Sequence, residues 1–391
     1  MIKQFALIAM IFFSSLGVTR EISHYTAGRL QQANQLAQND KLKQAIEVLH
    51  ETKASFDYDK AFVARVMAVF YWQDGKPKQA IEKMRYAVAS GLLQDEQAWV
   101  SQRMLADLYL TEHDFKQALK HYYQLVKVIP PTQQKDDIWL RIAQSHYQLE
   151  QWRDVIVATD RYLSADSNDR LQPLSLKLGA QLALKFSHDA IGTLGQLIAI
   201  EPNKLQWWRQ LSVLQTQIGQ GKQALGTLSL AKLKGLPLSQ NDRRILAQLY
   251  SKHGIPEKAA IEISELEEAQ TDIKLLVEQA TYWQLAKEWD SAISVWKKAA
   301  RIEPRYNWNL AQLLVQQGHY RASIPVLDNI KDKKADVALV KTRAFYKLNQ
   351  LDKALYQAKQ SDSFEPSIQA KNWIKFLSQV RGSSNSNQSD V

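Results

Sequence analysis

The chain contains no cysteine among its 391 residues, which excludes structural disulfides, thiolate metal sites and cysteine nucleophiles. Glycine (14 residues) and proline (10 residues) are scarce, whereas alanine, leucine, glutamine and lysine are abundant. Such a composition favours helices and offers little for strands. Beyond the N-terminal segment, no apolar run approaches the roughly 20 residues that a membrane-spanning helix needs.

Patterns that support catalysis or metal binding are also missing. The eight histidines form no H-E-x-x-H motif, and no carboxylate pair occurs at metal-ligand spacing. No Ser/His/Asp arrangement or nucleophile elbow can be singled out. We therefore expect a protein that is not an enzyme and that has no catalytic residues, no bound metal and no cofactor.

The first 20 residues differ from the rest of the chain. Lys3 precedes an apolar run from Phe5 to Phe13, and small residues follow up to Gly17. A positive start, a short apolar middle and a small-residue exit are typical of a secretory signal peptide, so we expect residues 1–20 to direct export to the periplasm. The alternative is an uncleaved inner-membrane anchor that faces the periplasm, although Phe5–Val18 is short for a span.

One small residue recurs about every 34 positions inside the same local pattern. We call these residues the markers. An internal repeat of this length is typical of stacked helical hairpins, in which each repeat contacts only its neighbours. The markers are Ala45, Ala80, Ala118, Val155, Ala190, Ala224, Ala259, Ala292, Ala322 and Ala354.

Further residues keep a fixed distance from the markers. A small residue lies 12 positions before most markers, and a proline lies 12 positions after four of them. Two helices approach to roughly 8–10 Å only where small side chains face each other, and a proline ends the second helix of the hairpin. The upstream residues are Ala33, Ala68, Ala106, Ala143, Ser212, Ala247 and Ala280, and the prolines are Pro130, Pro202, Pro304 and Pro366.

These distances predict an all-α fold, an α-α superhelix of the tetratricopeptide (TPR) type with about ten helical hairpins over residues 21–366. In the third repeat we expect helices over 96–111 and 115–128. Gly75, Gly219 and Gly254 lie five positions before their markers, where a residue free to adopt positive φ ends the first helix. A helix over 367–381, with Trp373, Ile374 and Leu377 on one face, is expected to cap the array, and the polar tail 382–391 is expected to be disordered.

The first helix of each hairpin carries the candidate binding residues. An arginine lies 15 positions before the marker in four repeats, at a position that resembles one lining the concave groove of the TPR family. The planar guanidinium donates two parallel hydrogen bonds to a carboxylate, which suits an acidic or extended protein segment. Simple exposure for solubility is the alternative. The protein-binding groove is predicted to include Arg65, Arg103, Asp107, Gln144, Tyr147, Arg209, Gln217, Arg244, Gln248 and Lys252.

The formal net charge of +10 raises the question of an anionic partner. The lysines are spread through every repeat and form no run, so we expect no nucleic-acid partner. A protein partner is the favoured interpretation. The alternative is an envelope assembly or cell-wall factor whose basic surface contacts anionic lipid or glycan.

Longer stretches resemble the exported TPR proteins encoded beside TonB/ExbB/ExbD-type energy-transduction systems of Gram-negative bacteria. The resemblance rests on REISHYTAGRLQQANQLAQNDKLKQAIEVL, on TLSLAKLKGLPLSQNDRRILAQLYSKHGIPEKAAIEI and on AKNWIKFL. Gly254–Ala260 (GIPEKAA) is its most specific element. The resemblance implies a periplasmic scaffold that serves a TonB-type complex in iron or haem uptake, and it supplies no catalytic residues.

Overall fold

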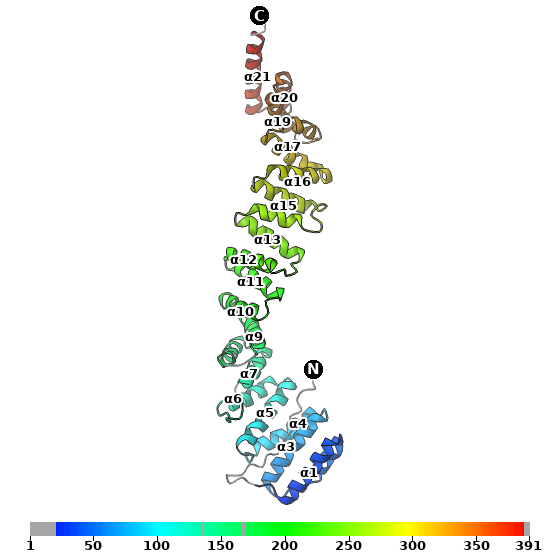
Figure 1. The fold of residues 1–391 in the computed structure, drawn as a ribbon, viewed down its shortest axis with the longest axis vertical. Coiled ribbons are helices and arrows are strands. Elements are labelled where there is room, and N and C mark those ends of the chain that lie inside the picture. The colour runs from blue at the N-terminus through cyan, green and yellow to red at the C-terminus, as the bar shows by residue number, and fades with distance from the viewer. Residues whose placement is uncertain (1–20, 134–135, 166–168, 387–391) are drawn as a thin grey trace. The chain divides into compact units, whose positions relative to one another are not determined.

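The computed structural model describes residues 21–133, 136–165 and 169–386. Within these ranges every regular element is helical, which confirms the expected all-α fold of stacked hairpins (Figure 1). The chain forms two compact units, divided between Leu197 and Ile198 inside helix α10. The expected signal peptide, residues 1–20, lies outside the described residues.

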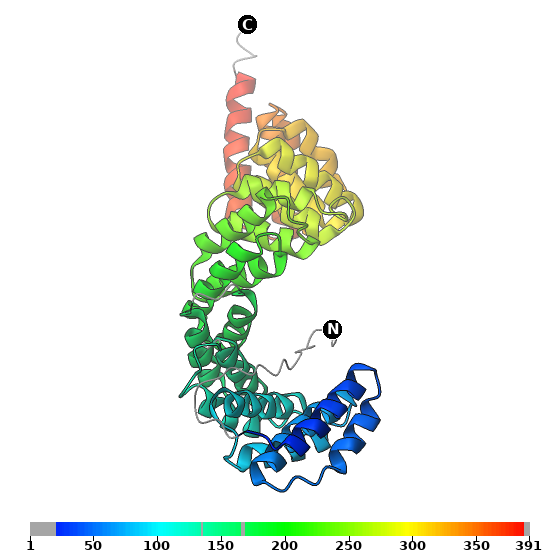
Figure 2. The same ribbon diagram turned by 60° about the horizontal axis from the view of Figure 1, so that its bottom comes forward.

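The first unit consists of five hairpins, and Figure 2 shows the earliest of them, in blue, packed side by side. The helices are α1 (His24–Gln38), α2 (Leu42–His50), α3 (Asp57–Gln73), α4 (Pro77–Ala89), α5 (Asp95–Thr111), α6 (Phe115–Leu125), α7 (Asp136–Gln148), α8 (Trp152–Leu163), α9 (Leu171–Ala183) and α10 (Ser187–Ile200).

The second unit continues with five hairpins and a final helix. A short 3₁₀ turn, η1, precedes the ninth hairpin. The helices are α11 (Leu205–Gln217), α12 (Gly221–Leu233), α13 (Gln240–Lys252), α14 (Pro256–Ser264), α15 (Ile273–Leu285), α16 (Trp289–Ile302), η1 (Pro304–Tyr306), α17 (Asn307–Gln316), α18 (Tyr320–Asp328), α19 (Lys334–Lys347), α20 (Leu351–Phe364) and α21 (Ile368–Ser386).

The markers lie at the crossing of the two helices in nine hairpins. Each of these nine is completely buried, and the small residues 12 positions upstream are buried with them. A side chain larger than alanine at either position would push the helices apart. Close crossing of small residues is therefore the packing rule of the array, with Leu178 as the one bulky residue at an upstream position.

The ninth hairpin corrects one marker. Ala322 is exposed, whereas its neighbour Ser323 is completely buried, together with Ala311 twelve positions upstream. Ala322 and Ser323 are both small, so residue size alone could not choose between them in a shortened repeat. Gly318, which has a φ of 80°, lies five positions before Ser323. This is the distance between the positive-φ residue and the marker in the other hairpins, so Ser323 is the marker of this one.

The turn inside every hairpin has one geometry. With Ser323 taken as the ninth marker, the residue five positions before the marker adopts positive φ in all ten hairpins. The backbone amide of the residue after it donates a hydrogen bond to the carbonyl oxygen nine positions before the marker, at 2.7–2.9 Å. This 6→1 hydrogen bond ends a helix in the Schellman manner. Glycine occupies the positive-φ position in only four hairpins. The residues at this position are Asp40, Gly75, His113, Glu150, Lys185, Gly219, Gly254, Lys287, Gly318 and Asn349.

Two expected helix ends differ from the structure. Helix α6 ends at Leu125 rather than at residue 128, and the carbonyl of Leu125 accepts a hydrogen bond from Trp99 Nε1 at 3.3 Å. Helix α21 packs Leu377 against α20, with Trp373 and Ile374 beside it. It ends at Ser386 rather than at residue 381, so that residues 382–386, expected to be part of a disordered tail, are helical. Residues 387–391 lie outside the described residues.

Candidate functional site

The ten candidate groove residues all lie on the first helix of a hairpin. In the first unit they are Arg65 on α3, Arg103 and Asp107 on α5, and Gln144 and Tyr147 on α7. In the second unit they are Arg209 and Gln217 on α11, and Arg244, Gln248 and Lys252 on α13.

Arg209 forms an ion pair with an acid of the chain itself. Its guanidinium forms a bidentate pair with Asp242 of the next hairpin, with Nε 2.9 Å from both carboxylate oxygens and a terminal nitrogen 2.6 Å from Oδ2. The Asp242 side chain is only 7% exposed. The parallel geometry is that of a strong charge-assisted pair, and it joins α11 to α13.

Asp242 also begins its own helix. Ser239 Oγ accepts from the Asp242 amide, and the Asp242 carboxylate accepts from the Ser239 amide at 2.8 Å, which forms a capping box. Burial alone would raise the pKa of Asp242, but the hydrogen bonds from Arg209 and Ser239 outweigh burial and hold the pKa below its usual value. The carboxylate is therefore stabilised in its charged form.

Arg244 repeats this arrangement one hairpin later. Its guanidinium lies 3.0–3.1 Å from Glu278 Oε2 on α15, and the Glu278 side chain is 15% exposed. Tyr282 donates to Glu278 Oε1 at 2.9 Å. Burial and the neighbouring carboxylate raise the pKa of the Tyr282 hydroxyl, so the tyrosine remains a donor.

Arg103 forms a weaker version of the same contact. Its terminal nitrogen lies 3.2 Å from Asp137, which is 56% exposed, and its Nε lies 3.9 Å from Asp107. Asp107 accepts a hydrogen bond from Tyr122 at 2.5 Å. Burial raises the pKa of Asp107 despite the lowering effect of Tyr122 and of the nearby arginines. Two of the predicted residues are thus brought together, and both are engaged inside the chain.

Arg65 differs from the other three arginines. Its guanidinium lies 5.5 Å from the Phe62 ring centroid, a cation–π contact, and no carboxylate of the described residues lies within ion-pair distance. Burial lowers the pKa of Arg65, although arginine stays protonated at any physiological pH. This side chain is half-buried against the aromatic surface of its own helix.

The remaining candidates divide by exposure. Tyr147 packs edge-on against Trp152, with ring centroids 5.2 Å apart. Its hydroxyl lies so close to Gly179 that a Cβ atom at that glycine would be 2.8 Å from the hydroxyl oxygen. Gln144 is half-buried. The exposed residues are Gln217 at the end of α11 and both Gln248 and Lys252 on α13.

Three of the four arginines therefore have a carboxylate partner within the chain, and their predicted role of gripping a partner's carboxylate stays a prediction. The acids that sequence reasoning missed carry a readable signal. Asp137, Asp242 and Glu278 follow their arginines by 34, 33 and 34 positions, which is one repeat length. A search for opposite charges one repeat apart would have found the pairs. The groove itself remains a prediction.

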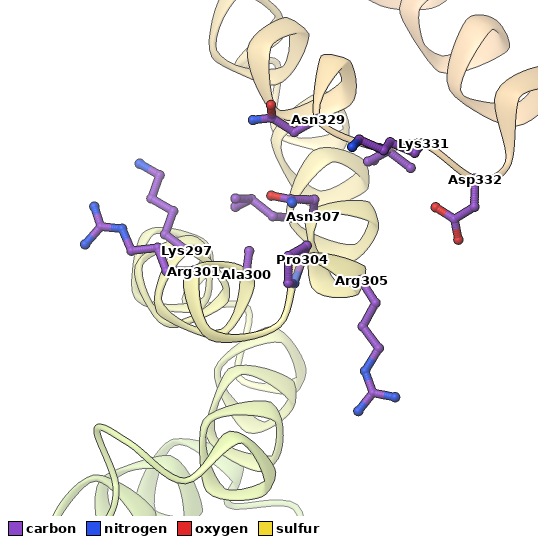
Figure 3. Close-up of a pocket in the computed structure, with 11 residues that line it drawn as sticks. Lys297, Ala300, Arg301, Pro304, Arg305, Asn307, Asn329, Lys331 and Asp332 are labelled. Carbon is purple, nitrogen blue, oxygen red and sulfur yellow. The ribbon is translucent and has the colours of Figure 1, made fainter.

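A hollow in the second unit is lined by several cations that have no ion-pair partner among the described residues. Helix α16, the start of α17 and the α18–α19 connection line an open hollow of about 800 Å³. Figure 3 shows Lys297 and Arg301 on one side of it and Asn329 and Lys331 on the other. Figure 3 also shows Arg305 pointing away from these residues, toward an ion pair with Glu303 at 2.5 Å.

Two further features are absent from residues 21–133, 136–165 and 169–386. No group of three or more histidine, aspartate or glutamate side chains is placed to hold a metal ion in these ranges. None of the helices over the same residues has the length and apolar character required to cross a membrane.

Comparisons with known proteins find similarity among solved structures but not among family models or curated proteins. No family model matches the chain, and no curated protein matches it. Among solved structures, a tetratricopeptide repeat protein from Parabacteroides merdae is 12% identical over 66% of this chain and 99% of its own, with a TM-score of 0.39. The C-terminal part of a TPR repeat-containing protein from Cytophaga hutchinsonii is 15% identical over 70% of this chain and 95% of its own, with a TM-score of 0.40. Neither score is high enough to carry a functional inference, so the assignment to a TPR-type solenoid rests on the hairpins themselves.

Proposed function

We propose that the chain is an exported, non-enzymatic scaffold that binds a partner protein along the first helices of its hairpins. The observation that carries this proposal is the stacking of hairpins within each unit, because stacked hairpins present a preformed surface that needs little ordering on binding. The repeat-spanning ion pairs of Arg209 and Arg244 add rigidity to that surface.

We further propose that the location is the periplasm and that the partner belongs to a TonB/ExbB/ExbD-type complex in iron or haem uptake. The N-terminal pattern from Lys3 to Gly17 supports export. The resemblance of GIPEKAA and the longer segments supports the partner class. Fractionation of cells, with the intact mass of the purified chain, tests the location: a periplasmic protein lacking about 20 N-terminal residues is expected, whereas a full-length cytosolic protein contradicts it.

The contact face is tested with variants that leave the ion pairs intact. Reversing Arg103 or Arg244 would place like charges opposite Asp137 or Glu278 and so perturb the stack. Gln217→Trp and Gln248→Trp instead add bulk at exposed positions of α11 and α13.

Gln223→Trp on the second helix of the sixth hairpin is the matched control, because Gln223 is also exposed. Affinity capture from periplasm, quantified by mass spectrometry, is expected to recover a partner with the native chain and with the control. Recovery is expected to fall with Gln217→Trp or Gln248→Trp. Equal recovery with all variants contradicts this face, and capture without ExbB, ExbD or TonB contradicts the partner class.

A further inference from the structure

We call the surface formed by the first helices of the hairpins the first-helix face. Three cations that line the hollow beside α16 differ from Arg209 and Arg244 on that face because they have no ion-pair partner among the described residues. Arg209 and Arg244 each have a shielded carboxylate partner. Within the described residues, Lys297, Arg301 and Lys331 are exposed and have no ion-pair partner, although all three line one cavity. An anion bound in the hollow would be attracted by all three.

The charges of the lining are unbalanced. Asp332 is the single carboxylate among the cavity's described lining residues, and Arg305, the fourth cation of the lining, is already paired with Glu303 outside it. Lys297 and Arg301 are four residues apart on α16 and so share one face of the helix. An anion in the hollow would meet both of them from the same side.

The uncharged part of the lining suits a peptide. Ala300 and Leu310 form a buried apolar floor, and Ile330 is half-buried beside them. Asn307 and Asn329 also line the hollow, and a side-chain amide both donates and accepts hydrogen bonds. A volume of about 800 Å³ falls within the range of about 300–1,000 Å³ that is usual for ligand pockets.

We propose that this hollow binds an acidic peptide segment of another protein, with its carboxylates at Lys297, Arg301 and Lys331 and an apolar side chain on the floor. A nucleic acid would require cations repeated along its backbone, whereas these are confined to one hollow. A lipid surface would require a flat face rather than a recessed apolar floor. The site uses the second helix of the eighth hairpin and two turns, so it is independent of the first-helix face in the proposed function.

The test is binding to an array of immobilised 12-residue peptides rich in Asp and Glu, beside the same peptides with Asn and Gln. The variant is Lys297→Glu with Lys331→Glu, in the full chain. Lys297→Glu also places a carboxylate one turn from Arg301 and neutralises it. The control is Lys222→Glu with Lys371→Glu, which makes the same charge change at two exposed lysines elsewhere in the second unit. Circular dichroism checks that both variants keep native helix content.

The native chain and the control are expected to bind a subset of the acidic peptides, to ignore the amide versions, and to lose binding as salt rises. The hollow variant is expected to bind the same peptides about tenfold or more weakly, because attractive charge contacts become repulsive. Equal binding by the hollow variant and the control overturns the proposal. Binding of anionic phospholipid vesicles that depends on Lys297 and Lys331, without any such peptide, overturns it in favour of a membrane. The peptide-binding result does not depend on whether Gln217→Trp or Gln248→Trp reduces partner capture, so the two proposals fail separately.

Discussion

The repeat-spanning pair of Arg209 and Asp242 makes a quantitative prediction. Arg209→Ala removes three hydrogen-bond contacts and leaves a carboxylate that is 7% exposed without its charge partner. We expect the substitution to loosen the packing of α11 against α13. The Ser239 cap would remain, because its bonds to Asp242 do not involve Arg209.

The magnitude follows from the burial of the two partners. Breaking a fully buried ion pair costs about 3–5 kcal/mol. The Arg209 side chain is 43% exposed, and Asp242 keeps two hydrogen bonds from Ser239. We therefore expect a smaller loss of about 1–2 kcal/mol, between the values for buried and for surface pairs.

Hydrogen exchange followed by mass spectrometry is the suitable assay, because a stacked array opens locally and need not unfold in one step. Peptides from α11 and α13 are expected to lose protection, while peptides from α3 are not. Arg381→Ala is the control: Arg381 pairs with Asp352 at 3.1 Å, but the two side chains are 53% and 78% exposed, so we expect a change below about 0.5 kcal/mol.

The same pair predicts a pH dependence. Because the pKa of Asp242 is lowered in the folded state from its usual value of 3.8, the pair stabilises the fold above that value and loses its effect as pH falls through the folded pKa. Arg209→Ala is expected to flatten this acid dependence. A loss no larger than that of Arg381→Ala, or an unchanged acid profile, would refute the reasoning.

Three further outcomes are expected, each measured as the change in thermal or guanidinium stability. Ser323→Leu overpacks the crossing of the ninth hairpin and lowers the stability by about 1–3 kcal/mol, whereas Ala322→Leu at the exposed neighbour changes the stability little. A larger loss for Ala322→Leu than for Ser323→Leu would show that Ala322 is the marker. Glu150→Gly relieves a φ of 55° and stabilises by about 0.5–1 kcal/mol, and a loss of stability would show that the turn tolerates glutamate without strain. Tyr122→Phe removes the donor to Asp107 and costs about 1–2 kcal/mol, while a neutral effect would mean that water replaces the hydroxyl.

Much of the fold could be predicted from the sequence because one packing rule repeats. Nine markers and the upstream alanines are buried where their spacing places them. The error at Ala322 arose because Ser323 is equally small and the repeat is shortened. The turn was only partly predicted: glycine at Gly75 and Gly219 signals positive φ, whereas Lys185 and Lys287 adopt the same angle under the 6→1 hydrogen bond.

The candidate site was less predictable because the type of a residue does not show which group will form its hydrogen bonds or ion pair. An arginine on a groove-type position has the same appearance whether its carboxylate comes from another protein or from the next hairpin. Arg209 and Arg244 are satisfied within the chain. The hollow near Lys297 assembles three separate segments, so no single stretch of sequence reveals it.

The most direct test of the scaffold account is site-specific photo-crosslinking in living cells. A benzophenone side chain at Gln217 or Gln248, on the exposed part of the first-helix face, is expected to capture the same envelope protein from both positions. The same group at Gln223, on the second helix of the sixth hairpin, is expected to capture none of it. Crosslinks from neither Gln217 nor Gln248, or equal crosslinks from Gln223, would contradict the account that this face binds a partner.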